Sequence, residues 1–343
     1  MPRLLRPPGT LAEWEANVGA ECTALARSHP RYGARLTDDV FAEVCERGYA
    51  ILPAYLPQRQ VADMGAAIRR IMPPLDEWLA KGETPAQQIN EMFPYDCEQA
   101  NALNQAICND PEALCFSARW LGTDDMHYRP GLGMARYPPE PGVGLEPEPE
   151  GWTDAAQGAH IDNGNNSLLP PTMDRRHSQI IFWFILEDTD VDQGPTVMWP
   201  TKMRADGPVA DMDSPAPFVG PAGSLCIFTN YSMHAASKYR RAEGQRYIWK
   251  HAWGRADYFW EGTAHYTNFG GTPNWQRFIA ELNPRQRELF RLPAPGHDYY
   301  TAESLAALEA MYPGFDRHGV YAAAMAPVAA ADDDGALPWE ARL

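Results

Sequence analysis

The chain has 343 residues, of which 45% are hydrophobic and 22% are charged, and these values are typical of a globular protein with a sizeable core. Its formal net charge of -16 would repel nucleic-acid phosphates and anionic lipid headgroups, so we expect neither nucleic acid nor a membrane as a partner. A small-molecule substrate fits this charge balance better.

Cysteine usage and the N-terminus indicate a reducing compartment. The six cysteines form no C-x-x-C pair and lack the tight spacing of a zinc site or a disulfide scaffold. Residues 1–8 lack the apolar core of a signal peptide, and no apolar run reaches the length of a membrane span. We therefore expect a cytoplasmic protein that is neither secreted nor embedded in a membrane.

The N-terminal third, about residues 1–125, is predicted to be a helical cover without obvious chemistry. Within it, the predicted helix Asp38–Arg47 can be capped by Thr37 and ended by Gly48. The predicted elements are helices at Leu11–Ser28, Asp38–Arg47 and Gln60–Met72 and a short buried strand at Tyr49–Leu52.

Strands separated by turns follow over about residues 126–260. The almost continuous apolar run Ser178–Leu186 favours a strand that is covered on both faces. Loops are expected at about 138–157 and 200–220, where proline and glycine are frequent. Several short strands with such turns indicate a sandwich or barrel. Further strands are predicted at Met134–Tyr137, Ser224–Thr229 and Gln245–Trp253.

Helical patterns return over about residues 261–343. The clearest are Trp275–Leu282, Pro284–Phe290 and Ala302–Met311. The order of helices, then strands, then helices predicts one domain spanning 1–343, with a mainly β core flanked by N- and C-terminal helices.

One short motif carries metal chemistry. Of the nine histidines, only His160 begins an H-x-D triplet. Residues i and i+2 of a strand point to the same face, so His160 and Asp162 can both reach one ion. His234 follows the predicted strand Ser224–Thr229 and can be the third ligand. Two histidines and a carboxylate with open positions suit non-haem iron(II). A triplet by itself could equally be a surface pair or an N-cap.

Arg246 stands on the predicted strand Gln245–Trp253 and can point into the barrel, where its guanidinium would offer a fork to a carboxylate. A buried arginine needs an anionic partner, and a dicarboxylate co-substrate would be one. An ordinary surface ion pair is the alternative. We expect the other conspicuous histidines to be structural or exposed: His177, His251 and His265. Weaker candidates for the pocket are Arg136, Tyr137, Asn163, Asn165, Asn166 and Trp183.

Taken in order, these motifs resemble the phytanoyl-CoA dioxygenase family of iron(II)/2-oxoglutarate oxygenases. The resemblance spans about residues 37–255 and rests on the H-x-D triplet, the segment Asp192–Pro200, the lone His234 after a strand, and Arg246 one strand later. It implies a double-stranded β-helix, the jelly-roll or cupin-like fold. Residues Trp199–Arg204 depart from the P-G-S-H-like turn of that family, so pocket residues there do not carry over.

The resemblance also implies a function. Iron(II) would sit on His160, Asp162 and His234, and 2-oxoglutarate would bind iron and Arg246. With O2, such an enzyme oxidises an unactivated C–H bond of a small molecule and releases succinate and CO2. Hydroxylation is the default outcome, with desaturation, ring formation and epimerisation open. Asp162 argues against related halogenases, which have a small residue there.

Two other functions remain compatible with the same residues. One is a zinc- or other metal-dependent hydrolase or isomerase on the same fold. The other is a catalytically silent relative that serves as a binding module. Neither the substrate nor the oligomeric state follows from the sequence.

Overall fold

The computed structural model describes residues 35–85, 88–91, 110–122, 126–162, 179–204, 207–255, 273–288 and 292–325. The chain packs as two compact units, Met1–Gly270 and Gly271–Leu343, and each is described by itself. The single domain expected over 1–343 stays a prediction. The predicted helix Leu11–Ser28 lies outside the described residues.

The first unit is built on two antiparallel sheets. The large sheet has the strand order β1-β9-β4-β11-β3-β2, the small sheet has the order β10-β5-β8, and β6 pairs with β7 in a separate hairpin. The strands of the large sheet are β1 (Tyr49–Leu52), β2 (Gln88–Glu91), β3 (Met126–Arg136), β4 (Ile180–Ile185), β9 (Leu225–Thr229) and β11 (Arg246–Arg255). The remaining strands are β5 (Thr196–Met198), β6 (Thr201–Arg204), β7 (Gly207–Ala210), β8 (Ala216–Pro217) and β10 (His234–Ala236).

The large sheet is buried on both of its faces. On β4, Phe182 and Phe184 point to one face, which we call the outer face, and pack in the same cluster as the helices of the N-terminal region. Trp183 and Ile185 point to the other, the inner face, and pack with Met198 of the small sheet. This explains the unbroken apolar run of β4, because alternate side chains enter two different cores.

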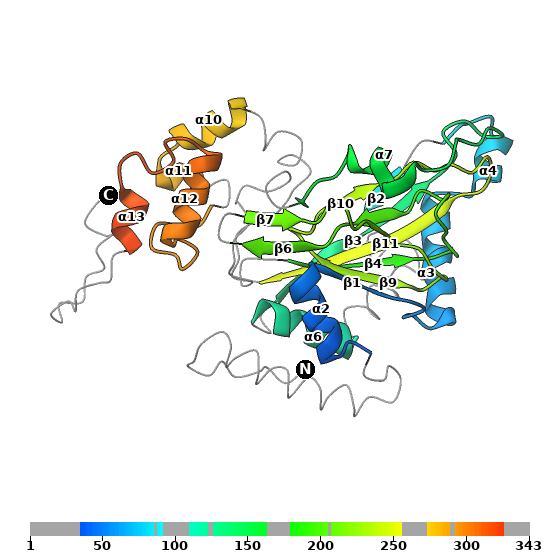
Figure 1. Ribbon diagram of the computed structural model, residues 1–343, viewed down its shortest axis with the longest axis horizontal. Coiled ribbons are helices and arrows are strands. Elements are labelled where there is room, and N and C mark those ends of the chain that lie inside the picture. Colours follow the sequence, from blue (N-terminus) through cyan, green and yellow to red (C-terminus); the bar gives the residue numbers. More distant parts are fainter. Residues whose placement is uncertain are drawn as a thin grey trace. The chain divides into compact units, whose positions relative to one another are not determined.

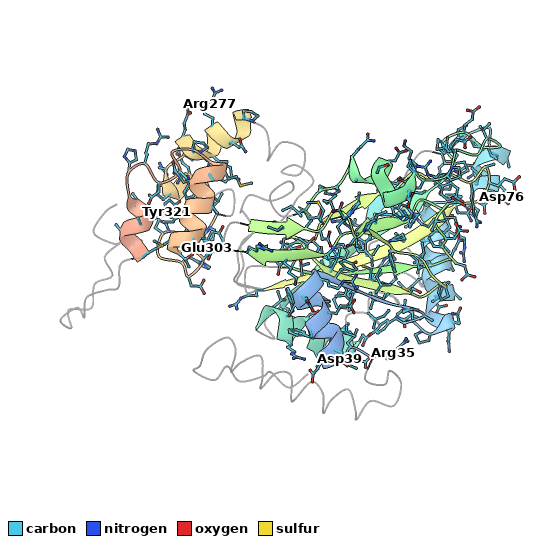
Figure 2. The ribbon with its side chains drawn as sticks, viewed as in Figure 1. Arg35, Asp39, Asp76, Arg277, Glu303 and Tyr321 are labelled. Atoms are coloured by element: carbon cyan, nitrogen blue, oxygen red, sulfur yellow. The ribbon has the colours of Figure 1, made fainter. Side chains whose placement is uncertain are left out.

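Helices cover the outer face. In α2 (Asp38–Arg47), the side chain of Thr37 accepts a hydrogen bond from the backbone of Val40, and Gly48 ends the helix at φ +79°, as the sequence predicted. Figure 1 shows α2 and α6 on one side of the large sheet and α7 on the other. The other helices of this unit within the described residues are α3 (Gln58–Ile71), α4 (Leu75–Ala80), α6 (Pro111–Leu121), the 3-10 turn η1 (Glu150–Trp152) and α7 (Thr153–Ala156). Charged side chains such as Asp39 and Asp76 point outward (Figure 2).

The architecture confirms the predicted mainly β core with helices around it: two antiparallel sheets face each other in a jelly-roll core. Two local expectations were wrong. The region 1–125 contains, besides its helices and the predicted strand Tyr49–Leu52 (β1), a strand that was not expected, β2, and these two strands form the edges of the large sheet. The segment 200–220 is not a loop, since it holds the hairpin β6–β7 and strand β8. These short strands are only partly buried, so they carry little apolar periodicity.

The second unit is helical, as predicted for the C-terminal region, with α10 (Pro273–Glu281), α11 (Pro284–Glu288), α12 (Ala302–Met311) and α13 (Val320–Met325). Its core is built around the buried Arg287, whose guanidinium donates to the carbonyl oxygens of Ile279 and Ala280 at 3.0 and 2.9 Å and lies 3.9 Å from the ring centroid of Phe315. Across the described part of the chain, the helices are too short or too polar to span a lipid bilayer.

Candidate metal centre

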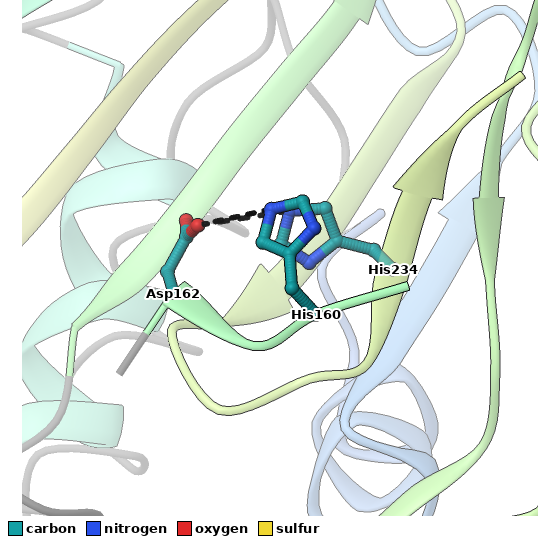
Figure 3. A group of neighbouring side chains, drawn as sticks. All are labelled: His160, Asp162 and His234. Carbon is teal, nitrogen blue, oxygen red and sulfur yellow. Dashed lines mark ion pairs between the residues drawn. The ribbon is translucent and has the colours of Figure 1, made fainter. Parts of the chain in front are cut away.

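The three predicted metal ligands come together at one end of the small sheet. His234 is the first residue of β10, and its backbone forms an antiparallel bridge with His160, with both N–H···O distances at 2.9 Å. Asp162 follows two residues after His160. The Nε2 atoms of both histidines lie 3.8 Å from Oδ1 of Asp162 (Figure 3). One donor atom from each residue lies within 4.8 Å of the other two.

The same hydrogen bond orients both imidazole rings. Nδ1 of His160 lies 2.9 Å from the carbonyl oxygen of Gly158, and Nδ1 of His234 lies 2.9 Å from that of Ser232. A carbonyl oxygen only accepts, so we assign the ring proton to Nδ1 in each case. Each Nε2 then presents a lone pair toward Asp162, which is how metal-binding histidines are oriented in proteins.

Burial favours the neutral form of the His234 ligand. His234 is only 4% exposed, and this burial lowers the pKa of its imidazole, an effect that the nearby carboxylate of Asp162 opposes. A neutral imidazole is the form that binds metals. The donor set fits a divalent cation, because atoms 3.8 Å apart leave room for an ion at about 2.0–2.2 Å from each. Two nitrogen ligands and one oxygen ligand on one side of such an ion would leave coordination positions on its other side open.

Aromatic rings of the inner face close one wall of the site. The ring centroid of His234 lies 5.3 Å from that of Phe228 and 6.0 Å from that of Trp183. The indole N–H of Trp183 is buried and meets no hydrogen-bond acceptor among the described residues. Trp183, considered a weak pocket candidate from the sequence, therefore packs directly against a predicted metal ligand and offers an unused donor.

Arg246 lies buried on the same face, as its strand position predicted. It is 3% exposed, and its Nε and Nη1 groups have no partner within the described part of the chain. Burial, and then the charge of Arg136, lower the pKa of Arg246 to about 9. Arg136 stands directly opposite on β3, and its own guanidinium donates to the carbonyl oxygen of Ser237 at 2.6 Å. A buried and a partly buried cation side by side create a strong preference for an anion.

The neighbouring arginines have different roles. For Arg246, the sequence left a surface ion pair open as the alternative role. It is Arg241 that forms such a pair, with Asp190, and both side chains are about half exposed. Arg240 is buried and binds Glu148 at 2.5 Å and Asp154 at 3.2 Å. Glu148 also accepts the N–H of Ala155 at 3.1 Å. This buried ion pair, which was not predicted from the sequence, fixes α7 immediately before His160.

The segment 138–157, expected to be an exposed loop, is therefore exposed only in part. Residues 142–147 are exposed, but the side chain of Glu148 is only 6% exposed because of its pairing with Arg240. The two residues are 92 positions apart, and no local pattern in the sequence connects them.

His251 is not part of the site. It points to the outer face, where its ring stacks on Phe182 with centroids 5.1 Å apart and planes 7° apart, and burial lowers its pKa to about 3. This agrees with the expected structural role. The other residues that we considered, His177, His265, Asn163, Asn165 and Asn166, lie outside the described residues.

Comparisons with known proteins give structural neighbours only. No protein-family model matches the chain, and no curated protein matches it. Among solved structures, it is similar to SnoK, a non-heme alpha-ketoglutarate-dependent carbocyclase from nogalamycin biosynthesis, with 14% identity, coverage of 71% of this chain and 93% of SnoK, and a TM-score of 0.47.

Two further neighbours have similar values. SnoN, a non-heme alpha-ketoglutarate-dependent epimerase from the same biosynthesis, has 13% identity, coverage of 68% and 90%, and a TM-score of 0.45. HygX from Streptomyces hygroscopicus, with nickel and 2-oxoglutarate bound, has 13% identity, coverage of 65% and 88%, and a TM-score of 0.42. At these values the likeness assigns no reaction to this chain, and the resemblance to phytanoyl-CoA dioxygenases stays a prediction.

Proposed function

We propose that the protein is an iron(II)- and 2-oxoglutarate-dependent oxygenase that acts on a small molecule. The observation that carries the proposal is a combination: a triad of two histidines and one aspartate, and a buried Arg246 whose guanidinium lacks a partner among the described residues. A metal site alone is compatible with many reactions. A metal site together with an unpaired buried cation calls for a ligand that has a carboxylate.

Each residue has a defined task in this proposal. His160, Asp162 and His234 would hold iron(II), and Arg246 would bind the carboxylate of 2-oxoglutarate that does not reach the metal. When bound, iron and 2-oxoglutarate supply the oxidation of a C–H bond by O2, with succinate and CO2 as co-products. Trp183 and Phe228 pack around His234 and keep water from that side of the site.

The two alternative functions explain Arg246 less well. A zinc-dependent hydrolase or isomerase needs the triad but has no use for an unpaired guanidinium inside the barrel. A silent binding relative has no reason to keep three aimed ligands together with Arg246. Hydroxylation remains the simplest outcome, and desaturation, cyclisation and epimerisation use the same site. A cytoplasmic location also remains part of the proposal.

The test measures succinate production and metal content together. Protein purified without oxygen and loaded with iron(II) should form succinate from 2-oxoglutarate when O2 is admitted. His160→Ala should abolish both iron retention and succinate formation, whereas His318→Ala, which changes an exposed histidine of the second unit, should leave both unchanged. Retention of zinc in place of iron, together with indifference to 2-oxoglutarate, would contradict the proposal and favour the hydrolase.

A further inference from the structure

Arg136, the last residue of β3, lies directly opposite Arg246 in the ladder that joins β3 to β11. Residues that are directly opposite in an antiparallel pair share a face of the sheet, with their Cβ atoms about 5 Å apart. This face is the inner one, because Met134, two residues before Arg136, packs in the inner core. Two guanidinium groups therefore start from neighbouring positions on one wall of the core.

The small sheet fixes the position of the Arg136 guanidinium. Its Nη1 donates to the carbonyl oxygen of Ser237 at 2.6 Å, and Ser237 directly follows β10. Ser237 is itself fixed, since its backbone N–H and its hydroxyl both donate to the carbonyl oxygen of Pro195, at 3.2 and 2.6 Å. The side chain of Arg136 thus reaches from the large sheet to the small one. This contact uses Nη1, and a guanidinium has further N–H groups that can bind a ligand.

The two arginines lie away from the metal ligands. Trp183 stands edge-on to His234, with ring centroids 6.0 Å apart, and is paired with Lys250 across the ladder between β4 and β11. Arg246 precedes Lys250 by four residues, which is about 13 Å along a strand. Arg136 stands at the same level as Arg246. An anion that contacts both arginines would therefore be bound at a distance from the metal, as is the far carboxylate of a metal-bound dicarboxylate.

One carboxylate can serve both guanidinium groups. Its two oxygens have about four lone-pair sites, which is enough to accept hydrogen bonds from two arginine forks. On Arg246, Nε and Nη1 have no partner among the described residues. The charge of Arg136 is, after burial, the second cause that lowers the pKa of Arg246. A carboxylate between the two side chains would relieve this repulsion, so both arginines are placed to favour its binding.

We propose that Arg136 is a second anchor for the far carboxylate of 2-oxoglutarate and that, together with Arg246, it makes the site select 2-oxo dicarboxylates over 2-oxo acids with a single carboxylate. This inference rests on the proposed oxygenase function. The alternative is a structural role, in which Arg136 only links the two sheets through Ser237. An anchor discriminates between ligands with and without the far carboxylate, whereas a structural link affects every ligand of the site alike.

The test measures this selectivity by calorimetry on the full chain loaded with manganese(II), so that no turnover occurs. The two ligands are 2-oxoglutarate and 2-oxopentanoate, which has the same metal-binding end and a methyl group in place of the far carboxylate. The unmodified protein should bind 2-oxoglutarate about 100-fold more tightly. In Arg136→Met this preference should fall about tenfold, through weaker binding of 2-oxoglutarate, while the affinity for 2-oxopentanoate stays within about twofold.

Two further variants make the result specific. Arg136→Gln also removes the charge but keeps an N–H donor for the link to the small sheet. Its preference should fall about tenfold as well, and it decides the test if Arg136→Met does not fold. Arg204→Met is the matched control, because Arg204 is an exposed arginine of β6, and it should retain the full preference.

Separate results would overturn the inference. An equal loss of affinity for both ligands in the Arg136 variants would leave Arg136 as a structural link. Unchanged affinity for both ligands would show that Arg136 does not contact the co-substrate. Equal binding of the two ligands by the unmodified protein would show that the site does not select a far carboxylate. Failure of the unmodified, manganese-loaded protein to bind either ligand would instead contradict the proposed function.

Discussion

The two faces of strand β11 carry different kinds of side chain. The outer face consists of large rings that fill volume, and the inner face carries two cations in addition to small or branched apolar residues. Outward side chains are Tyr247, Trp249, His251 and Trp253, and inward side chains are Arg246, Ile248, Lys250 and Ala252. The outer face should therefore determine whether the chain folds, and the inner face what it binds.

The buried histidines His234 and His251 also differ in role, one as a predicted metal ligand and the other as a structural residue of the outer face. Burial lowers the pKa of both His234 and His251, so neither burial nor pKa separates a ligand from a structural residue. The difference lies in orientation. His234 is fixed by the carbonyl oxygen of Ser232 with its Nε2 toward Asp162, whereas His251 lies between aromatic rings. A histidine is a candidate ligand when a hydrogen bond aims its free nitrogen at other ligands.

Removing a ring from the outer face should have the largest effect on stability. Phe182 is fully buried, stacks on His251 and meets Phe116 edge-on. Phe182→Ala should lower the free energy of unfolding by about 4 kcal/mol, through lost burial and a cavity. Urea unfolding measures the change. Leu79→Ala, at a side chain that is 46% exposed, is the control and should change stability by less than about 1 kcal/mol.

Phe182→Ala should leave the metal affinity of the folded fraction within about twofold, since Phe182 points away from the site. A loss of metal affinity larger than the loss of stability would contradict the separation of the two faces.

Breaking the ion pair that supports the inner site should come next. Arg240→Met leaves Glu148 buried without its partner and should cost about 3 kcal/mol of unfolding free energy. Because the pair fastens α7 just before His160, affinity for manganese(II), measured by calorimetry, should fall as well. Arg241→Met, which removes an exposed pair with Asp190, should cost less than about 1 kcal/mol. Equal effects of the two substitutions would show that the buried pair does not position the ligands.

Features that depend on local periodicity, such as helix caps and the faces of strands, were predicted from the sequence. Thr37 and Gly48 bounded α2 because capping preferences act over one turn. The alternation of a strand predicted that His160 and Asp162 share a face, and the two side chains do meet, although His160 forms only an isolated bridge with His234 and not a strand. Arg246 was predicted to point inward by the same alternation. The same alternation places Lys250 on the face of Arg246, although a single lysine in a sequence is usually an exposed residue.

Features that depend on tertiary contacts were not predicted from the sequence. The pairing of Arg240 with Glu148 joins two loops that are far apart in the sequence, and any of several acidic residues could have been its partner. Strand β2 pairs with β3 at the edge of the large sheet, within the region of about residues 1–125 that was predicted to be a helical cover. Edge strands and short hairpins are stabilised by their neighbours more than by their own propensity, so their sequences carry little signal.

Substitution of Arg246 should have effects opposite to those of Phe182→Ala, with stability retained and ligand affinity lost. Arg246→Met removes a buried charge without a described partner, so the ligand-free protein should unfold at equal or higher urea concentration. Affinity of the manganese(II)-loaded protein for 2-oxoglutarate should fall about 100-fold, which corresponds to about 2.7 kcal/mol. Calorimetry and urea unfolding of the same preparation separate the two effects. Unchanged affinity for 2-oxoglutarate would remove the main support for the proposed co-substrate.

The smallest predicted effect concerns pH and the outer face. Because burial holds the pKa of His251 at about 3, below the value of about 6.5 in an unfolded chain, the unfolded state binds the extra proton as pH falls below 6.5, and stability is lost on acidification. His251→Phe removes this proton and keeps the ring stack. Between pH 6.5 and 5 the variant should therefore gain about 1.5 kcal/mol relative to the unmodified protein, as measured by urea unfolding. The difference between the two proteins is the relevant quantity, since Glu112, with a pKa raised to about 7 by burial, titrates in the same range with the opposite sign in both. A constant difference across this range would mean that His251 is protonated in the folded protein, and the outer face would then not be the apolar layer that its neighbours indicate.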